Sequence, residues 1–418
     1  MSRPNSPTTT AESPHSDRIP RIRLDSTSRF SRIPLFLILA SSLLTLTHCD
    51  NPGAVGRSFG PDDPTLVIDT IGVTGLSNAT LKAYSGNLQF VSAGTYQNDV
   101  FGTYEAIGLF QPILISETDI LSPTADFTLR LHFNGITGDT NAVSQFEVYE
   151  ITRRWRAITW SLDSIPQIAS TYLTTFNVTS EDSVEVSLPP SFRNKYLDYQ
   201  RNGDRNRDST YTAQVFGFAI RGVGTNKIVA VNVAESGMYI TQNDTTLSNK
   251  FVIFRQTANT LIHTPSAAPL PSDVTIVESN FEGAGQLDLV LSEELVGSRF
   301  PQRVEFVLYE DTLTTKASMP SGHVWMDQQQ VPIYVLEDFE TQLAIFNNAN
   351  ILVNRTDDGS FRSNFTTFYN SVITQGEQTG SMYFLGHRYN GIIRPRLFFN
   401  TTSTRRPPIL ITTTFVEE

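Results

Sequence analysis

The sequence has a single cysteine, Cys49, among 418 residues. One cysteine excludes an intrachain disulfide framework, a cysteine-rich zinc site and a cysteine-held iron–sulfur cluster. Charged residues make up only 17% of the chain, below the roughly 25% that is usual for soluble domains. The formal net charge is -11. Because an acidic chain without a block of basic residues offers little to phosphates, the composition argues against nucleic-acid binding.

Motifs that carry catalysis are also missing. The chain has no Gly-x-Ser-x-Gly elbow, no P-loop, no dinucleotide-binding fingerprint and no His-Glu-x-x-His run. Four histidines lie beyond residue 48, none within five residues of another: His132, His263, His323 and His387. Two carboxylates can hydrolyse a glycoside only at a defined separation, which a sequence does not supply. We therefore expect a protein without enzymatic activity, and we expect most of its carboxylates to be solvated.

Long hydrophobic runs are absent, but one short run lies near the start. Residues 33–46 are mostly apolar and follow a segment that carries five arginines between residues 18 and 32. The run is too short and too rich in Ser and Thr for a membrane span of about 20 residues. A basic segment before a short apolar run is the pattern of a signal peptide, so the sequence predicts a signal peptide over residues 1–48.

The only cysteine directly follows this run, and its surroundings resemble a known export motif. The sequence Leu46-Thr47-His48-Cys49 resembles the lipobox of bacterial lipoproteins, although His48 stands where a small residue usually precedes the cysteine. The resemblance implies that the sulfur of Cys49 receives a diacylglycerol, that the peptide is cut before it and that the new amine is acylated. The alternative is an ordinary buried cysteine.

The expected mature chain begins with a tether. Residues 49–64 are rich in Pro, Gly and Asp, as flexible linkers are. Removal of residues 1–48 takes away six arginines and three acids, so the mature net charge becomes -14. Acyl chains would hold such a protein firmly at a membrane. We expect it in the cell envelope, at the outer membrane or cell surface, with the periplasmic face also open.

The rest of the chain is patterned for β-strands. Short segments rich in Val, Ile, Phe, Tyr and Thr, such as 127–133, 145–151 and 215–220, alternate apolar and polar residues between turn signals. The strongest helical segment is 336–344. A loose internal repeat has about the spacing of one sandwich domain. We therefore predict an all-β protein with two tandem jelly-roll-like β-sandwiches, over residues 65–245 and 246–418.

Three segments resemble parts of known families. Residues 146–160 contain a strand, then Trp155, then the pair Thr159-Trp160, and resemble the central motif of DNRLRE (disaggregatase-related) modules. Residues 393–398 look like the Arg-Pro-Arg-Leu strand that closes such modules, and residues 93–102 resemble a phrase of uncharacterised surface lipoproteins of Bacteroidetes. The resemblance implies a non-catalytic jelly-roll module, similar to carbohydrate-binding modules, and carries no catalytic residue.

Trp155 and Trp160 are the candidate glycan-binding residues. Modules that bind sugars stack aromatic rings on the apolar faces of sugar rings. A separation of five residues puts the two side chains on opposite faces of an ideal strand, so a shared platform needs a bulge or a loop. The alternative is that one or both fill the core, as large aromatics commonly do.

A polar tract is the candidate metal site. Oxygen donors alternate along it, at Asn202, Asp204, Asn206 and Asp208. This spacing resembles that of a loop that wraps Ca²⁺, although three arginines between residues 201 and 207 add positive charge. The alternative is a solvated hairpin tip. We expect no cofactor, and a structural calcium ion stays open.

Taken together, the sequence predicts a lipid-anchored envelope protein that binds an extracellular polymer, with a glycan favoured, or structures the cell surface. The membrane and a glycan or envelope protein are the expected partners, and nucleic acid is not. A second hypothesis is an accessory lipoprotein subunit of an outer-membrane or secretion complex. A third is a hydrolase of surface polysaccharide.

Overall fold

The structure is a computed structural model, and the part of the chain that it describes begins at Thr65. The described residues are 65–72, 75–80, 85–116, 121–201, 207–224, 226–242, 250–278, 283–290, 301–317, 330–335, 351–374, 379–384 and 391–416. The predicted signal peptide (1–48), Cys49 with the tether (49–64), and the helical segment 336–344 lie outside them. All of the described residues belong to one compact unit.

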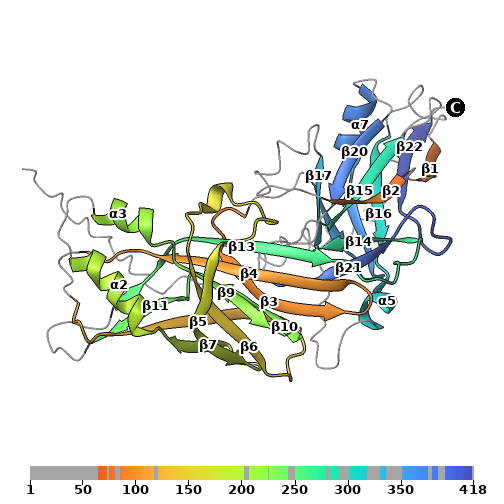
Figure 1. The fold of residues 1–418 in the computed structure, drawn as a ribbon. Coiled ribbons are helices and arrows are strands. Elements are labelled where there is room, and N and C mark those ends of the chain that lie inside the picture. Colours follow the sequence, from red (N-terminus) through yellow and green to blue (C-terminus); the bar gives the residue numbers. More distant parts are fainter. Residues whose placement is uncertain are drawn as a thin grey trace, which may run out of the picture. The chain divides into compact units, whose positions relative to one another are not determined.

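The fold is all-β, which confirms the predicted class: curled antiparallel sheets make up most of the described chain (Figure 1). The larger sheet follows the order β12-β11-β5-β10-β3-β4-β9-β6-β7, with β13 on β4 and β8 on β5. Its strands are β3 (Phe90–Asn98), β4 (Gly102–Pro112), β5 (Asp126–Gly138), β6 (Ser144–Ile151), β7 (Ile168–Val178), β8 (Ser183–Ser187), β9 (Phe218–Val223), β10 (Asn226–Asn232), β11 (Gly237–Thr241), β12 (Lys250–Val252) and β13 (Phe254–Thr264).

A second sheet follows the order β1-β22-β16-β19-β18-β17-β20-β15-β2. Its strands are β1 (Thr65–Gly72), β2 (Gly75–Thr80), β15 (Gly283–Val290), β16 (Arg303–Tyr309), β17 (Gln330–Val335), β18 (Ile351–Arg355), β19 (Ser360–Asn364), β20 (Thr379–Phe384) and β22 (Ile409–Val416). A separate pair joins β14 (Val274–Glu278) to β21 (Pro395–Phe399).

The sheets do not follow the predicted division at residue 245. Strands β1 and β2 pair with β22 and β15 near the other end of the chain. Strands β12 and β13 pair with β11 and β4 of the larger sheet. Strand pairing between distant segments leaves no local signal, because a strand's own pattern shows which face is buried but not which strand lies beside it.

Alternation of side chains builds the main core. Along β5, Phe127, Leu129 and Leu131 are buried, while the residues between them are less so. They belong to a cluster inside the larger sheet that also contains Phe110, Phe146 and other apolar residues of β4, β6, β9 and β10. Each such side chain contributes roughly 1.5–3 kcal/mol when it is fully buried.

Helices occupy places that the sequence reading had not assigned. They are η1 (Ala157–Thr159), α2 (Pro190–Arg201), α3 (Arg207–Gln214), α5 (Thr312–Ala317) and α7 (Thr366–Thr374). The sequence of α2 does contain a helix pattern that could have predicted it. Phe192, Tyr196 and Leu197 have helical spacing and are buried, and a proline stands in the first turn. Helix α2 ends at Arg201 and α3 begins at Arg207, so helices flank the polar tract, whose residues 202–206 lie outside the described part of the chain.

Gly217, directly before β9, lies against the backbone of β4. Its φ is +85°, and a Cβ built on it would lie 2.0 Å from the carbonyl oxygen of Phe110. The neighbour is backbone of β4, which has no flexible side chain to move away. Glycine is therefore required here for both its conformation and its lack of a side chain.

Gly217→Ala should destabilise the protein much more than Gly224→Ala, which is its matched control. Gly224 has a similar φ of +87° but open space around it, so its substitution should cost only the left-handed strain, about 1–2 kcal/mol. At Gly217 the clash should add roughly 1–3 kcal/mol. Urea unfolding of both variants measures the difference, and equal losses would contradict the close approach of β9 to β4.

Candidate functional site

The loop that follows β6 places both candidate tryptophans against β13. Trp155 is only 5% exposed, and its indole N–H donates to the carbonyl of Phe216 at 2.8 Å. Its ring packs in a cluster with Leu109 of β4 and Ala258 of β13. Trp155 therefore fills the core, which was the alternative to glycan binding. Its ring offers no surface on which a sugar could stack.

Trp160 lies differently, because it is only half-buried. Its ring packs edge-on against Trp155, with centroids 6.2 Å apart and planes at 73°. Its indole N–H donates to the hydroxyl of Thr260 at 3.3 Å, and its carbonyl accepts the backbone N–H of Ser85 at 2.7 Å. These contacts fix the orientation of the ring before any ligand arrives.

Trp160 lines a shallow cavity of about 380 Å³, which we call the Trp160 pocket. Its lining consists of Ile151, Arg153, Arg154, Trp160, Ser164, Ile165, Pro166 and Gln167. The lining contains no carboxylate. The structure thus brings one of the two predicted glycan-binding residues to a pocket and places the other beneath it.

Arginines give this pocket a positive charge. Arg153, Arg154 and the neighbouring Arg156 are exposed, and none forms an ion pair within the described part of the chain. Elsewhere in this sheet, Arg130 pairs with Glu185 at 2.6 Å and Arg221 pairs with Glu105 at 3.1 Å. A guanidinium presents a planar fork of donors that matches carboxylate, sulfate or phosphate oxygens. The pocket can therefore receive an anionic group beside an aromatic ring.

The structure describes only one of the four predicted calcium ligands. Asn202, Asp204 and Asn206 lie outside the described residues, and Asp208 is an exposed residue in the first turn of α3. Among the residues described, no group of three or more His, Cys, Asp or Glu side chains is placed to hold a metal ion. Calcium binding stays a prediction.

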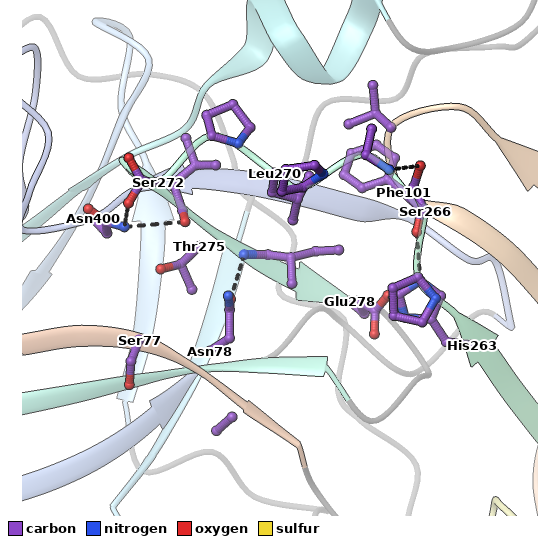
Figure 2. A pocket seen from close by; sticks show the side chains of 18 of the residues that line it. Ser77, Asn78, Phe101, His263, Ser266, Leu270, Ser272, Thr275, Glu278 and Asn400 are labelled. Carbon is purple, nitrogen blue, oxygen red and sulfur yellow. Dashed lines mark hydrogen bonds and ion pairs between the residues drawn. The ribbon is translucent and has the colours of Figure 1, made fainter.

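A second site, which the sequence analysis missed, lies where β13 ends. His263 is the cross-strand partner of Tyr104 in β4, and their rings stack with centroids 4.3 Å apart and planes at 5°. Glu278 of β14 is 2% exposed, and its Oε1 accepts the hydroxyl of Tyr104 at 2.5 Å. The same oxygen lies 3.0 Å from Nδ1 of His263. Figure 2 labels the side chains of His263 and Glu278, which lie next to each other.

Both ring nitrogens of His263 face acceptors. Nδ1 faces the carboxylate of Glu278, and Nε2 lies 2.7 Å from the carbonyl oxygen of Phe101. Only the protonated imidazole can donate to both. Burial alone lowers the pKa of His263, but the hydrogen bond and charge of Glu278, with the Phe101 carbonyl, outweigh it, so the pKa is raised above 6.5. Burial, followed by the charge of Glu278, also raises the pKa of Tyr104 well above its ordinary value.

This cluster borders a cavity of about 730 Å³. The lining comes from β2, β13, β14 and the proline-rich segment after β13: Leu76, Ser77, Asn78, Ala79, Val100, Phe101, Leu261, His263, Pro265, Ser266, Ala268, Pro269, Leu270, Pro271, Ser272, Val274, Thr275, Ile276, Glu278 and Asn400. Tyr104 and Glu278 are 174 residues apart in sequence. A local sequence motif therefore could not have predicted the cluster.

The raised pKa of His263 predicts how stability depends on pH. A raised folded-state pKa means that stabilisation is complete below the ordinary value and is lost as pH rises through the folded value. His263→Phe keeps a ring to stack on Tyr104 but removes the charge. The wild type should therefore exceed this variant in unfolding free energy most at about pH 5.5 and least at about pH 9.

Urea unfolding at several pH values measures this difference. His132→Phe, at a histidine outside the cluster, controls for the loss of a histidine elsewhere. A wild-type advantage that is constant over the whole pH range would contradict the protonated arrangement of His263.

Comparisons with known proteins add little. No family model matches the chain, and no curated protein matches it. Among solved structures, the chain is similar to one of the Macrobrachium rosenbergii nodavirus at 10% identity, over 87% of this chain and 93% of that chain, with a TM-score of 0.15. It is also similar to the VP2 subviral particle of infectious bursal disease virus at 10% identity, over 84% and 77%, with a TM-score of 0.10. Likeness at this level carries no argument.

No helix in the described part of the chain combines the length and the apolar character that a membrane span requires.

Proposed function

We propose that this chain is a non-catalytic, lipid-anchored protein of the cell envelope that binds an extracellular polymer, an anionic glycan, at the Trp160 pocket. The observation that carries the proposal is the set of three exposed arginines without ion-pair partners beside a half-buried tryptophan of fixed orientation. An unpaired charge cluster next to an aromatic surface is the pattern expected of a binding site.

The chemistry of the pocket favours an anionic sugar over a neutral one. The ring of Trp160 can cover the apolar face of a sugar, which removes apolar surface from water. Arg153 and Arg154 can hydrogen-bond a carboxylate or sulfate on that sugar or on its neighbour. A polymer presents such groups repeatedly, so several weak contacts combine along one chain.

The negative net charge of the protein means that binding of an anion must depend on the arginines at the pocket. The mature chain, with a net charge of -14 after removal of residues 1–48, repels an anionic polymer at long range. At physiological salt, charges farther apart than about 8 Å are largely screened. Binding therefore depends on the arginines at the pocket itself, and it should weaken as salt rises.

Trp160→Ala should weaken binding of an anionic polysaccharide, such as a polyuronate, by about tenfold, equivalent to about 1.4 kcal/mol. The reason is the loss of apolar contact with the sugar ring. Trp160→Phe should retain part of the affinity. Ile158→Ser is the matched control, because Ile158 is 76% exposed in the same loop but does not line the pocket. Calorimetric titration of the purified protein measures these affinities.

The double variant Arg153→Gln, Arg154→Gln should weaken the same interaction and flatten its dependence on salt concentration. Binding of a neutral polysaccharide should change little. Failure of the wild-type protein to bind any anionic polysaccharide, or equal binding by the Trp160→Ala variant, would remove the proposal.

The anchor has a separate test. Cys49 lies outside the described residues, so lipidation rests on the lipobox-like sequence alone. Cys49→Ser should move the protein from the membrane fraction to the soluble fraction and abolish palmitate labelling, because the sulfur that carries the lipid is gone. Unchanged fractionation and labelling would refute the anchor but would leave the Trp160 pocket untouched.

A further inference from the structure

The face of the larger sheet that holds the Trp160 pocket continues beyond it along β6 and β7. Ile151 of β6 lines the pocket, and Tyr149 stands two residues before it, so both side chains point to the same face. Ala219 of β9 pairs with Tyr149 and belongs to the same apolar cluster as Ile151, which agrees with a common face. At about 3.4 Å per residue, Tyr149 lies roughly 7 Å along β6 from the pocket. This distance is on the scale of one sugar in a polymer.

Tyr172 of β7 is the exposed partner of Tyr149. The two residues are opposite each other in the pairing of β6 with β7. Their rings meet edge-on, with centroids 6.4 Å apart and planes at 89°, and the hydroxyl of Tyr149 donates to Glu147 at 2.5 Å. Tyr149 is half-buried, whereas Tyr172 is 54% exposed. The ring of Tyr149 therefore supports that of Tyr172, which presents an aromatic surface to solvent.

Strand β7 is an edge strand whose side chains carry no charge. It is the last strand in the order of the larger sheet, beside β6 (Figure 1), and Ile168–Val178 include no charged residue and no proline. Edge strands often carry such residues, which prevent another strand from adding. The pairing of β7 with β6 is irregular instead, because it shifts on both sides of the Tyr149–Tyr172 pair. Irregularities of this kind hinder strand addition and are common next to active sites, where they redirect a side chain.

The charge around the two tyrosines differs from that at the Trp160 pocket. Glu147 follows Tyr149 on the same face of β6, and Arg221 of β9 lies opposite Glu147. Arg221 is already paired with Glu105 at 3.1 Å. These two carboxylates and one guanidinium leave an excess of negative charge, which repels an acidic sugar. A neutral sugar is favoured, because its apolar face can cover Tyr172 and its hydroxyls can donate to the carboxylate of Glu147.

We infer that the glycan site extends from the Trp160 pocket to Tyr172 and takes a polymer in which acidic and neutral sugars alternate. The acidic sugar lies at Trp160, Arg153 and Arg154, and the neutral sugar next to it lies on Tyr172. Two weak contacts on one polymer chain combine, so an open face can bind without a deep cavity. The inference rests on the function proposed for the Trp160 pocket, to which it adds the class of polymer and a second contact residue.

Oligosaccharides of equal length test the class of polymer. A hexasaccharide of hyaluronate, in which glucuronate alternates with N-acetylglucosamine, is compared with a hexasaccharide of polygalacturonate, in which every sugar is acidic. Calorimetric titration of the full-length protein should give at least about fivefold tighter binding for hyaluronate, because contact with Tyr172 removes apolar surface from water.

Tyr172→Ala should abolish this preference. Binding of the hyaluronate hexasaccharide should fall about fivefold, while binding of the polygalacturonate hexasaccharide should change little. Tyr172→Phe keeps the ring and should retain most of the preference. Phe251→Ala is the matched control, because Phe251 is also an exposed aromatic residue but belongs to β12, at the opposite end of the strand order. Tyr172→Ala should leave the salt dependence of binding unchanged, because it removes no charge.

Glu147→Gln tests the role of charge at the second subsite. The variant removes the carboxylate that repels an acidic sugar but keeps an oxygen to accept the hydroxyl of Tyr149. It should therefore bind the polygalacturonate hexasaccharide more tightly than the wild type does, which narrows the preference for hyaluronate. Unchanged binding of polygalacturonate by this variant would contradict the assignment of a neutral sugar to Tyr172.

The inference and the function proposed for the Trp160 pocket fail in different ways. The inference is wrong if the wild type binds hyaluronate no more tightly than polygalacturonate, or if its preference survives Tyr172→Ala; both results leave the Trp160 pocket in place. Failure of the wild type to bind either hexasaccharide would remove the proposed function and the inference with it. Trp160→Ala should weaken binding of both hexasaccharides, a pattern that Tyr172→Ala does not share.

Discussion

The register between β4 and β13 is the constraint on which both candidate sites depend. The two strands pair over most of their length, and the pairing sets His263 opposite Tyr104 and Thr260 opposite Ile107. Successive residues of a strand point to opposite faces. Tyr104 and His263 therefore lie on one face, and Ile107 and Thr260 lie on the other. A slip of one residue would reverse both faces at once, so a change in this register would disturb both sites.

Each face supports its site through different contacts. On one face, Thr260 receives the indole N–H of Trp160, and nearby on β13 Leu261 donates its backbone N–H to Leu162 at 2.7 Å. The loop after β6 is thus held to β13 by backbone as well as side chains. On the other face, the stacked pair of His263 and Tyr104 meets Glu278 from β14. Rigid strands position both sets of groups more closely than loops alone could.

How far the sequence predicts this structure depends on the range of each interaction. Alternation within 127–133 correctly predicted a strand with Phe127 and Leu129 inside. The pairing of β1 with β22 joins Thr65 to Val416 and leaves no trace in either segment. Trp155 and Trp160 carry the same side chain in one loop, yet burial separates their roles, and only tertiary packing decides it. The cluster of Tyr104, His263 and Glu278 could not be predicted from the sequence either, because tertiary packing brings its three residues together.

The net charge, like the strand patterns, does not predict how side chains are arranged at a site. The net charge of the mature chain, -14, describes the field far from the protein, but a ligand in contact feels mainly the charges within a Debye length of about 8–10 Å. Beside Trp160 those charges are Arg153 and Arg154, and beside the cavity at the end of β13 they are His263 and Glu278, which pair with each other. The two places on one acidic chain therefore differ in local charge, which is positive at the Trp160 pocket and balanced at His263 and Glu278. The composition that argued against nucleic acid could not distinguish them, because local charge depends on which charged side chains the fold pairs with each other.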